Sequence, residues 1–399
     1  MPKMSWKSAG FTFLVAVGVA SSAAIAGYLT AKRHYGEELR EDSAMQIEER
    51  VARQNVLFDD VRAISYAAER SFMRRYEAVS AVDVSAEFNR LFPPFGDGTR
   101  RSDPALFDGQ MLDNGDYVYG VGAFISEVEI PLERQRRLLA AFHTVRQHGE
   151  AINPRFDNLN FVSRDNDLII FAPQRDDRLE YYRALAPADF DLQSEDLARI
   201  VEPQNNPTGS TACTALSRLM YVTDGTALTT GCHTPVRSGG RHLGSFGITI
   251  SMQNYLANAI VDAEENVENM IMTRDGELIA HQELLFEEVL TPEAVSRAEA
   301  FAQTAPISRG IHSQGRPSGV FETADGRIIS YGRISTPGWY FIAARPTWVV
   351  HLKASQVAAM IFVFSFFGVY LQSFVVYLVR LQRRWRLRQA RESEQFARA

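Results

Sequence analysis

The sequence predicts an α+β protein in which a long N-terminal stalk helix carries two antiparallel sheets, flanked by two transmembrane helices. Residues 8–31 and 354–379 contain no Asp, Glu, Lys or Arg. Residues 37–79 lack Pro and Gly and repeat apolar side chains at helical spacing. Downstream of them, one succession of helix, strand, polar turn and strand occurs twice. These three observations determine the predicted fold class.

Both uncharged runs are long enough to cross a bilayer, which takes roughly 20 apolar residues in a helix. Six arginines follow the second run between residues 380 and 391, and Lys3 and Lys7 precede the first. Excess Lys and Arg marks the cytoplasmic side of a membrane protein. We therefore expect cytoplasmic segments at 1–7 and 380–399, transmembrane helices at 8–31 and 354–379, and a location outside the cytoplasm for residues 32–353.

The first run has an alternative interpretation as a cleavable secretory signal. Two lysines, an apolar stretch and Ala24-Ile25-Ala26 match that pattern. An uncleaved anchor is favoured because the apolar character continues past Ala26 to Leu29. Both interpretations place the central region outside the cytoplasm.

Composition narrows the classes of function. The formal net charge is −6 although the C-terminal tail is rich in Arg, so the external region is acidic. Nucleic acid is therefore not an expected partner, because binding phosphates requires a basic surface. The eight histidines are scattered, and neither a phosphate-binding loop nor a nucleophile-elbow motif is present. We expect no cofactor, no metal site and no catalytic activity in this chain.

A stalk helix is expected within residues 32–92, and it carries an apolar stripe. Part of the stripe should cover the sheets, whereas the turns around residues 45–51 have no obvious sheet to pack against. The spacing is close to that of a coiled-coil seam, which predicts a parallel homodimer. The stripe consists of Ile47, Val51, Phe58, Val61 and Ile64.

Two modules follow the stalk. Pro93-Pro94 and the glycines after them mark the break. The first module, 93–265, should contain strands at 117–125, 158–162, 168–172, 218–222, 227–230 and 243–252, with helices at 131–148 and 254–265. The second module, 266–353, should contain strands at 267–273, 278–281, 319–322, 328–334 and 339–344, with a helix at 292–303.

The only cysteines, Cys213 and Cys232, lie in the external region, where oxidation is permitted. They flank a predicted hairpin with Asp224-Gly225 at its turn. A tight turn there would place Cys232 opposite Ser217, so a disulfide requires a bulge or bend before Arg218. The sequence leaves open whether the two cysteines are bridged or free. A zinc site is disfavoured because neither cysteine has a second thiol close to it in the sequence.

Several motifs resemble a known family. Residues 270–281 (MIMTRDGELIAH), 319–327 (GVFETADGR) and 331–346 (YGRISTPGWYFIAARP) resemble the membrane-proximal half of double Cache sensor domains. Residues 158–163, 178–184 and 244–252 (GSFGITISM) resemble the membrane-distal half. The resemblance implies two tandem PAS-like sheets and a small-molecule ligand, usually in the distal module. It also implies a bacterial inner-membrane receptor with a periplasmic sensor region.

The family's amino-acid-binding motif is only partly matched. Tyr182 fits the Tyr of its Trp-Tyr pair and Tyr181 replaces the Trp, while the Arg position falls on Leu179, with Arg178 one place away. The late Asp corresponds to Thr249. Without that carboxylate a buried ammonium group loses its charged partner, so an amino-acid ligand is disfavoured.

The candidate ligand-binding residues combine aromatic rings with arginines. Arg178 or Arg183 could hold a carboxylate through a bidentate guanidinium pair. The alternatives are aromatic packing on the sheet with hydroxyls facing water, and arginines that are simply solvated. The candidates are Arg178, Tyr181, Tyr182, Arg183, Tyr221 and Thr249.

The expected function is small-molecule sensing outside the cytoplasm and signalling across the membrane. The family's outputs are histidine kinases, chemoreceptors and cyclic-dinucleotide enzymes. A two-component sensor histidine kinase is favoured because residues 380–399 contain no Pro or Gly and suit a helical signalling linker. Its partners would be a kinase or response regulator downstream. The competing hypothesis is a membrane-anchored solute-binding protein acting with a partner in trans.

Overall fold

The computed structural model describes residues 6–78, 84–113, 115–153, 155–174, 179–218, 227–250, 252–260 and 266–396. They form two compact units. The first comprises the described residues of Met1–Met45, Ala324–Ile328 and Pro346–Ala399, and the second those of Gln46–Thr323 and Ile329–Arg345.

The first unit is built from α1 (Trp6–Ala78), which begins in it, and α10 (Trp348–Phe396). Each contains a stretch long and apolar enough to cross a membrane. The uncharged run in α10 continues without interruption into the arginine-rich segment, so residues 380–396 are helical as the linker prediction requires.

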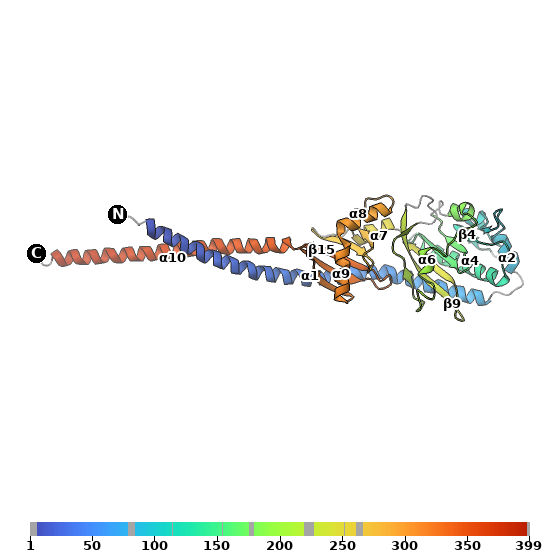
Figure 1. Ribbon diagram of the computed structural model, residues 1–399, viewed down its shortest axis with the longest axis horizontal. Coiled ribbons are helices and arrows are strands. Elements are labelled where there is room, and N and C mark those ends of the chain that lie inside the picture. The colour runs from blue at the N-terminus through green and yellow to red at the C-terminus, as the bar shows by residue number, and fades with distance from the viewer. Residues whose placement is uncertain are drawn as a thin grey trace. The chain divides into compact units, whose positions relative to one another are not determined.

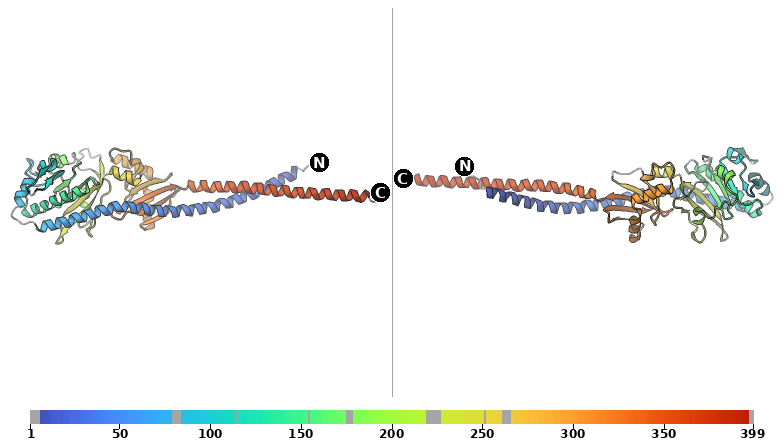
Figure 2. Two further views of the ribbon diagram at one scale, coloured as in Figure 1. Left: turned by 180° about the vertical axis from the view of Figure 1, so that it is seen from behind. Right: turned by 45° about the horizontal axis from the view of Figure 1, so that its top comes forward.

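The two helices of this unit run antiparallel and in contact (Figure 2). Phe13 meets Phe366 edge to face at 5.8 Å, and the Tyr28 hydroxyl lies 2.6 Å from Nδ1 of His351. Gly27 faces Ile361 so closely that a Cβ at Gly27 would overlap the Ile361 side chain. Small residues let helix backbones approach one another, which is a common basis of helix pairing in membranes.

In the second unit α1 supplies a continuous core stripe, and its blue ribbon runs past the strands of this unit (Figure 1). Phe58 packs edge to face on Trp339 at 5.3 Å, and Phe72 stacks on Phe161 at 5.2 Å. α1 ends at Ala78, and a separate helix α2 (Val84–Leu91) follows. The pattern over residues 37–79 thus lies within α1 as far as Ala78, and residues 79–83 of the expected stalk region 32–92 lie outside the described residues.

Residues of the expected dimer seam pack against other residues of the same chain. Ile47 is buried, and Val51 lies against Gly332 of β14 (Arg327–Arg333), where a glycine Cβ would come within 2.7 Å of Val51 Cγ2. The expectation that the turns around residues 45–51 have no sheet to pack against is therefore wrong. The glycine in β14 makes room for the helix. The homodimer stays a prediction, but this stripe does not supply its seam.

The distal sheet is antiparallel, with strand order β1-β4-β6-β5-β10-β9-β7 and β8 paired to β9. A separate hairpin joins β2 (Gln110–Met111) to β3 (Tyr117–Val118). The expected strand over 117–125 is interrupted at Gly120, which has a φ of 64°. The strands of the large sheet are β1 (Arg100–Arg101), β4 (Val121–Ile125), β5 (Asn158–Ser163), β6 (Leu168–Phe171), β7 (Ala212–Cys213), β8 (Ser217–Arg218), β9 (Leu228–Ser238) and β10 (Arg241–Ile250).

The proximal sheet has the order β12-β11-β15-β14-β13. Numbered in chain order, its strands run 2-1-5-4-3, and the distal strands β6-β5-β10-β9-β7 repeat that order. The shared order confirms the predicted pair of tandem antiparallel sheets. The remaining proximal strands are β11 (Glu268–Met272), β12 (Leu278–His281), β13 (Ser318–Glu322) and β15 (Tyr340–Pro346).

Helices cover or connect the strands. α4 (Leu132–Ile152) follows Pro131 and buries Leu138, Phe142 and Val145 in the distal core. α8 (Pro292–Ala302) begins with a cap in which Thr291 Oγ1 accepts the amide N–H of Ala294 at 3.2 Å. The others are α3 (Ala105–Asp108), the π-helical turn η1 (Tyr181–Leu185), α6 (Asp196–Arg199), α7 (Met252–Ile260), η2 (Gln282–Leu284) and α9 (Thr304–Gln314).

A buried ion pair ties α4 to the turn between β5 and β6. Arg134 donates from Nη2 to Asp167 Oδ1 at 2.6 Å and from Nε to Oδ2 at 3.0 Å. Ser163 Oγ donates to the same carboxylate at 2.7 Å. Burial raises the pKa of the Asp167 carboxyl, whereas Arg134 acts to lower it. The bidentate geometry compensates part of the cost of burying both charges.

Candidate ligand-binding site

The two faces of the distal sheet differ in character because successive side chains of a strand point to opposite sides. One face is apolar: Phe161 and Phe246 pack there against Phe72 of α1. The other face carries Asn158 and Asn160 of β5, which alternate with those core residues. This second face, called the polar face here, also carries the aliphatic Val162, Leu168 and Ile170, and it is hollowed into a cavity.

This cavity has a volume of about 60 Å³. An engineered cavity of about 150 Å³ binds benzene, so a cavity of this size suits only a very small ligand. Its lining combines polar side chains of β5, β9 and β10 with aliphatic side chains of β5 and β6, and it is closed by Tyr182 of η1 and Leu197 of α6. The lining residues are Asn158, Asn160, Val162, Leu168, Ile170, Tyr182, Leu197, Thr214, Ser217, Arg218, Thr229, Gly231, His233 and Thr249.

The centre of the polar face is a row of three residues on adjacent strands. Gly247 of β10 pairs with Asn160 of β5 on one side and with His233 of β9 on the other. A Cβ at Gly247 would lie 2.5 Å from His233 Nε2 and 2.6 Å from Asn160 Oδ1. Glycine is therefore required here because the imidazole of His233 and the amide of Asn160 pack over it and leave no room for a side chain.

The polar side chains of this row are oriented by their neighbours. Asn160 Nδ2 donates to Asn158 Oδ1 at 2.9 Å, and His233 Nδ1 lies 3.3 Å from the hydroxyl of Ser245. Asn160 Oδ1 is buried and has no hydrogen-bond partner among the described residues. Burial lowers the pKa of His233 from 6.5 to about 4, so its imidazole is neutral at pH 7. The cavity wall thus includes an unpaired acceptor, Asn160 Oδ1, and the neutral ring of His233.

The structure places only some of the predicted ligand-binding residues at the cavity. Tyr182 and Thr249 line the cavity. Tyr181 packs edge to face on Phe190 at 5.7 Å, and Arg183 lies over the ring of Phe107 at 4.4 Å. Arg183 Nε also donates to the carbonyl of Leu179 at 3.3 Å, so this guanidinium serves packing of η1. Arg178 and Tyr221 lie outside the described residues.

Sequence reasoning missed the three polar residues at the centre of the cavity: Asn158, Asn160 and His233. The alternation Asn-Leu-Asn-Phe-Val from residue 158 to 162 was a usable signal, because a half-buried strand should not direct two amides into a core. His233 had no comparable local signal. Its place opposite Gly247 follows from the pairing of β9 with β10.

A disulfide bond joins Cys213 of β7 to Cys232 of β9, which are direct cross-strand partners. The expected pairing of Cys232 with Ser217 is wrong, because Ser217 pairs with Thr229. The irregular residues 214–216 between β7 and β8 supply the bend that a disulfide required. Thr214 is held there by Thr230 Oγ1, which donates to its carbonyl at 2.7 Å. The disulfide therefore lies beside the cavity wall formed by Thr214, Ser217 and Arg218.

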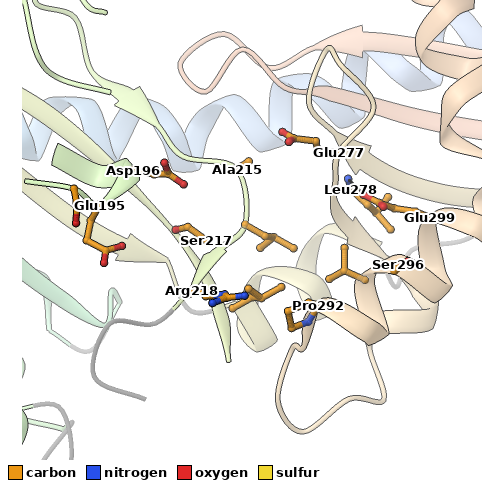
Figure 3. A pocket seen from close by; sticks show the side chains of 14 residues that line it. Glu195, Asp196, Ala215, Ser217, Arg218, Glu277, Leu278, Pro292, Ser296 and Glu299 are labelled. Carbon is orange, nitrogen blue, oxygen red and sulfur yellow. Dashed lines mark hydrogen bonds between the residues drawn. The ribbon is translucent and has the colours of Figure 1, made fainter. Parts of the chain in front are cut away.

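A second cavity, of about 540 Å³, is lined by residues of both modules (Figure 3). It shares Ser217 and Arg218 with the smaller cavity. Four carboxylates line it: Glu195, Asp196, Glu277 and Glu299. Burial raises the pKa of Glu195, and the nearby Asp196 and Asp191 raise it further. Glu299 accepts the amide N–H of Leu278 at 2.9 Å, which gives that carboxylate a structural role.

Acid should destabilise the fold through His233. The pKa of His233 is depressed to about 4 in the folded protein, so the unfolded chain binds a proton at this imidazole more readily. The free energy of unfolding that this group contributes is fully present above pH 6.5 and is lost as the pH falls toward 4. From pH 7 to pH 5 the loss should be about 2 kcal/mol. Denaturant unfolding of the wild-type chain and of His233→Gln at both pH values measures it. His242, whose pKa is lowered by burial, contributes equally in both proteins, and an identical pH dependence of the two would contradict the assignment.

No protein-family model and no curated protein sequence matches the chain. Among solved structures, the ligand-binding domain of the Pseudomonas fluorescens chemoreceptor CtaA in complex with L-isoleucine is 12% identical, with a TM-score of 0.45 over 80% of this chain and 97% of that chain. The Campylobacter jejuni chemoreceptor Tlp3 domain in complex with L-valine is 9% identical, with a TM-score of 0.44 over 80% of this chain and 98% of that one. This chain is thus similar, at low identity, to sensor domains of bacterial chemoreceptors.

Proposed function

We propose that this chain is the sensor portion of a two-span membrane receptor that binds a small solute outside the cytoplasm and transmits the signal through α10. The observation that carries the proposal is the hollow on the polar face of the distal sheet. A buried acceptor without a partner costs free energy. It is therefore expected where a ligand completes the hydrogen bonding.

The motifs that resemble double Cache domains support the same function, as does the repeated 2-1-5-4-3 sheet order. The apolar stretches of α1 and α10 support anchoring at both ends. We favour a histidine kinase as the output because the arginine-rich end of α10 suits a helical signalling linker. The proposal assigns no catalytic step to the chain itself.

The ligand-binding part is tested with the full chain in lipid nanodiscs. A panel of small solutes is added and the unfolding temperature is measured. A binder present at 100 times its Kd should stabilise the folded state by about 2.7 kcal/mol. Thr249→Leu should abolish the shift, because the larger side chain fills a cavity of about 60 Å³.

The matched control is Thr208→Leu, the same substitution at an exposed threonine of the same module. It should leave both the unfolding temperature and the ligand-induced shift unchanged. A panel in which no solute shifts the wild-type protein, or a shift that survives Thr249→Leu, would overturn the proposal.

The topology predicts different accessibility for two engineered thiols. Both native cysteines are disulfide-bonded, so the background needs no further change. In intact cells a membrane-impermeant thiol reagent should label Ser313→Cys, an exposed position on α9, and should not label Ser393→Cys on α10. Equal labelling of the two positions would exclude a membrane between them.

A further inference from the structure

We infer that a groove between the end of α1 and α4 binds a doubly charged oxyanion, at a site separate from the sheet cavity of the distal module. The groove has a volume of about 360 Å³. Among the described residues its lining contains two arginines and a histidine but no carboxylate, although the external region as a whole is acidic. The lining residues are Ser71, Arg74, Arg75, Ala78, Gln147 and His148.

The two helices that form the groove are hydrogen-bonded to each other. Arg75 Nη2 of α1 donates to Gln147 Oε1 of α4 at 2.7 Å. The next residue of α1, Tyr76, donates from its hydroxyl to Glu133 Oε1 of α4 at 2.7 Å. The groove therefore lies between two joined elements, and its cationic side chains come from both of them.

The positive charge at the groove is poorly compensated. Burial lowers the pKa of Arg75, and the neighbouring Arg146 and Arg74 lower it further. Asp116 acts in the opposite direction with the smallest effect, and its carboxylate is already paired with Arg146. Arg74 is exposed and takes part in no ion pair within the described part of the chain. Both guanidinium groups remain charged at pH 7, so the groove attracts an anion.

The helix dipole explains only part of this cluster. It favours a cation in the last turn of α1, where Arg75 lies. The last turn of α4 contains no basic residue, so the dipole of α4 does not account for His148 or Arg146. Positive groups that converge from two helices repel one another, and a bound anion would remove that repulsion.

The lining suits an oxyanion that carries two charges. A guanidinium group binds carboxylate or phosphate oxygens through two parallel hydrogen bonds. Burial and the two arginines of the groove lower the pKa of His148, so its imidazole is neutral at pH 7 and can donate one hydrogen bond. The Ser71 hydroxyl can donate another. A singly charged anion would leave one of the two arginines without a counter-charge, whereas a dianion compensates both.

The test measures anion binding to the full chain in nanodiscs of phosphatidylcholine, whose zwitterionic headgroup adds no net charge. Sulfate, inorganic phosphate and succinate are titrated by calorimetry at pH 7, with acetate as the singly charged control. Ionic strength is held constant with sodium chloride because salt screens charges. We expect at least one dianion to bind at least about tenfold more tightly than acetate. Tighter binding of sulfate or phosphate identifies a tetrahedral oxyanion, and tighter binding of succinate identifies a dicarboxylate.

Three variants assign the binding to the groove. Arg74→Gln and Arg75→Gln should each weaken it by at least about tenfold, because each removes a charge-assisted hydrogen bond. Arg74 is exposed, so Arg74→Gln keeps the test intact if Arg75→Gln fails to fold. The matched control is Arg62→Gln, the same change at an exposed arginine of α1. Arg62 precedes Arg74 by twelve residues, which is about 18 Å along a helix and exceeds the Debye length of about 8 Å. It should leave the affinity unchanged.

Three outcomes would overturn the inference. Equal affinity for acetate and all three dianions would mean that the arginines are only solvated and compensate the end of α1. An equal loss in Arg62→Gln and Arg74→Gln would mean attraction by the net charge of the surface, without a site. Binding that survives Arg74→Gln and is lost in Thr249→Leu would place the anion in the sheet cavity beside Arg218.

Discussion

Arg134→Ala is expected to lower the free energy of unfolding by about 3–5 kcal/mol, because it leaves the carboxylate of Asp167 buried without its partner. The Arg134 side chain is 7% exposed and that of Asp167 is 0% exposed. Ser163 would still donate to the carboxylate, but a hydroxyl cannot replace the charge. Denaturant unfolding of the full chain measures the loss.

A second, exposed ion pair of Arg134 provides the control. Arg134 Nη1 also pairs with Glu127 at 2.9 Å, but that side chain is 63% exposed. Glu127→Ala should therefore cost less than about 1 kcal/mol, since exposed ion pairs contribute little. Removing both buried charges with Arg134→Met and Asp167→Leu should recover part of the loss. If Arg134→Ala cost no more than Glu127→Ala, the pair would not hold α4 to the sheet as described.

Loss of the disulfide is expected to have the next largest effect. Cys213 and Cys232 are separated by 19 residues, a loop for which cross-linking contributes about 3 kcal/mol by restricting the unfolded chain. The double variant Cys213→Ala, Cys232→Ala should unfold at correspondingly lower denaturant concentration. Binding of any solute found by the panel should weaken too, because Thr214 and Ser217 of the cavity wall lie just beyond Cys213.

Reduction separates the effect of the bond from that of the side chains. Dithiothreitol should shift the unfolding midpoint of the wild-type chain toward that of the double variant and should leave the double variant itself unchanged. A wild-type midpoint that does not respond to reductant, under conditions where free thiols are detected, would contradict the prediction.

Much of the fold could be predicted because its signals are local. The strands at 158–163, 168–171, 278–281 and 318–322 lie within a residue or two of their expected bounds, since apolar alternation between polar turns marks them. Helix α8 begins at Pro292 as predicted, after its threonine cap. α9 was missed because it follows α8 directly, with only Gln303 at a φ of 54° between them.

The candidate site could be predicted only in part. Tyr182 and Thr249 were found through a family motif, and both line the cavity. Arg183 belongs to the same short segment, yet the geometry of η1 directs it onto Phe107 instead. A π-helical turn changes which neighbouring side chains share a face. The motif therefore located the wall of the cavity and could not say which of its residues face inward.

The sequence by itself determined the class of structure, the two apolar spans and the two tandem sheets, because periodicity and charge act over a few residues. Tertiary structure alone decided which stripe residues of α1 are buried, which strand faces Cys213, and that His233 meets Asn160 across Gly247. These outcomes depend on the register between strands distant in sequence. A shift of one residue would turn every side chain to the opposite face, and no local pattern determines that register.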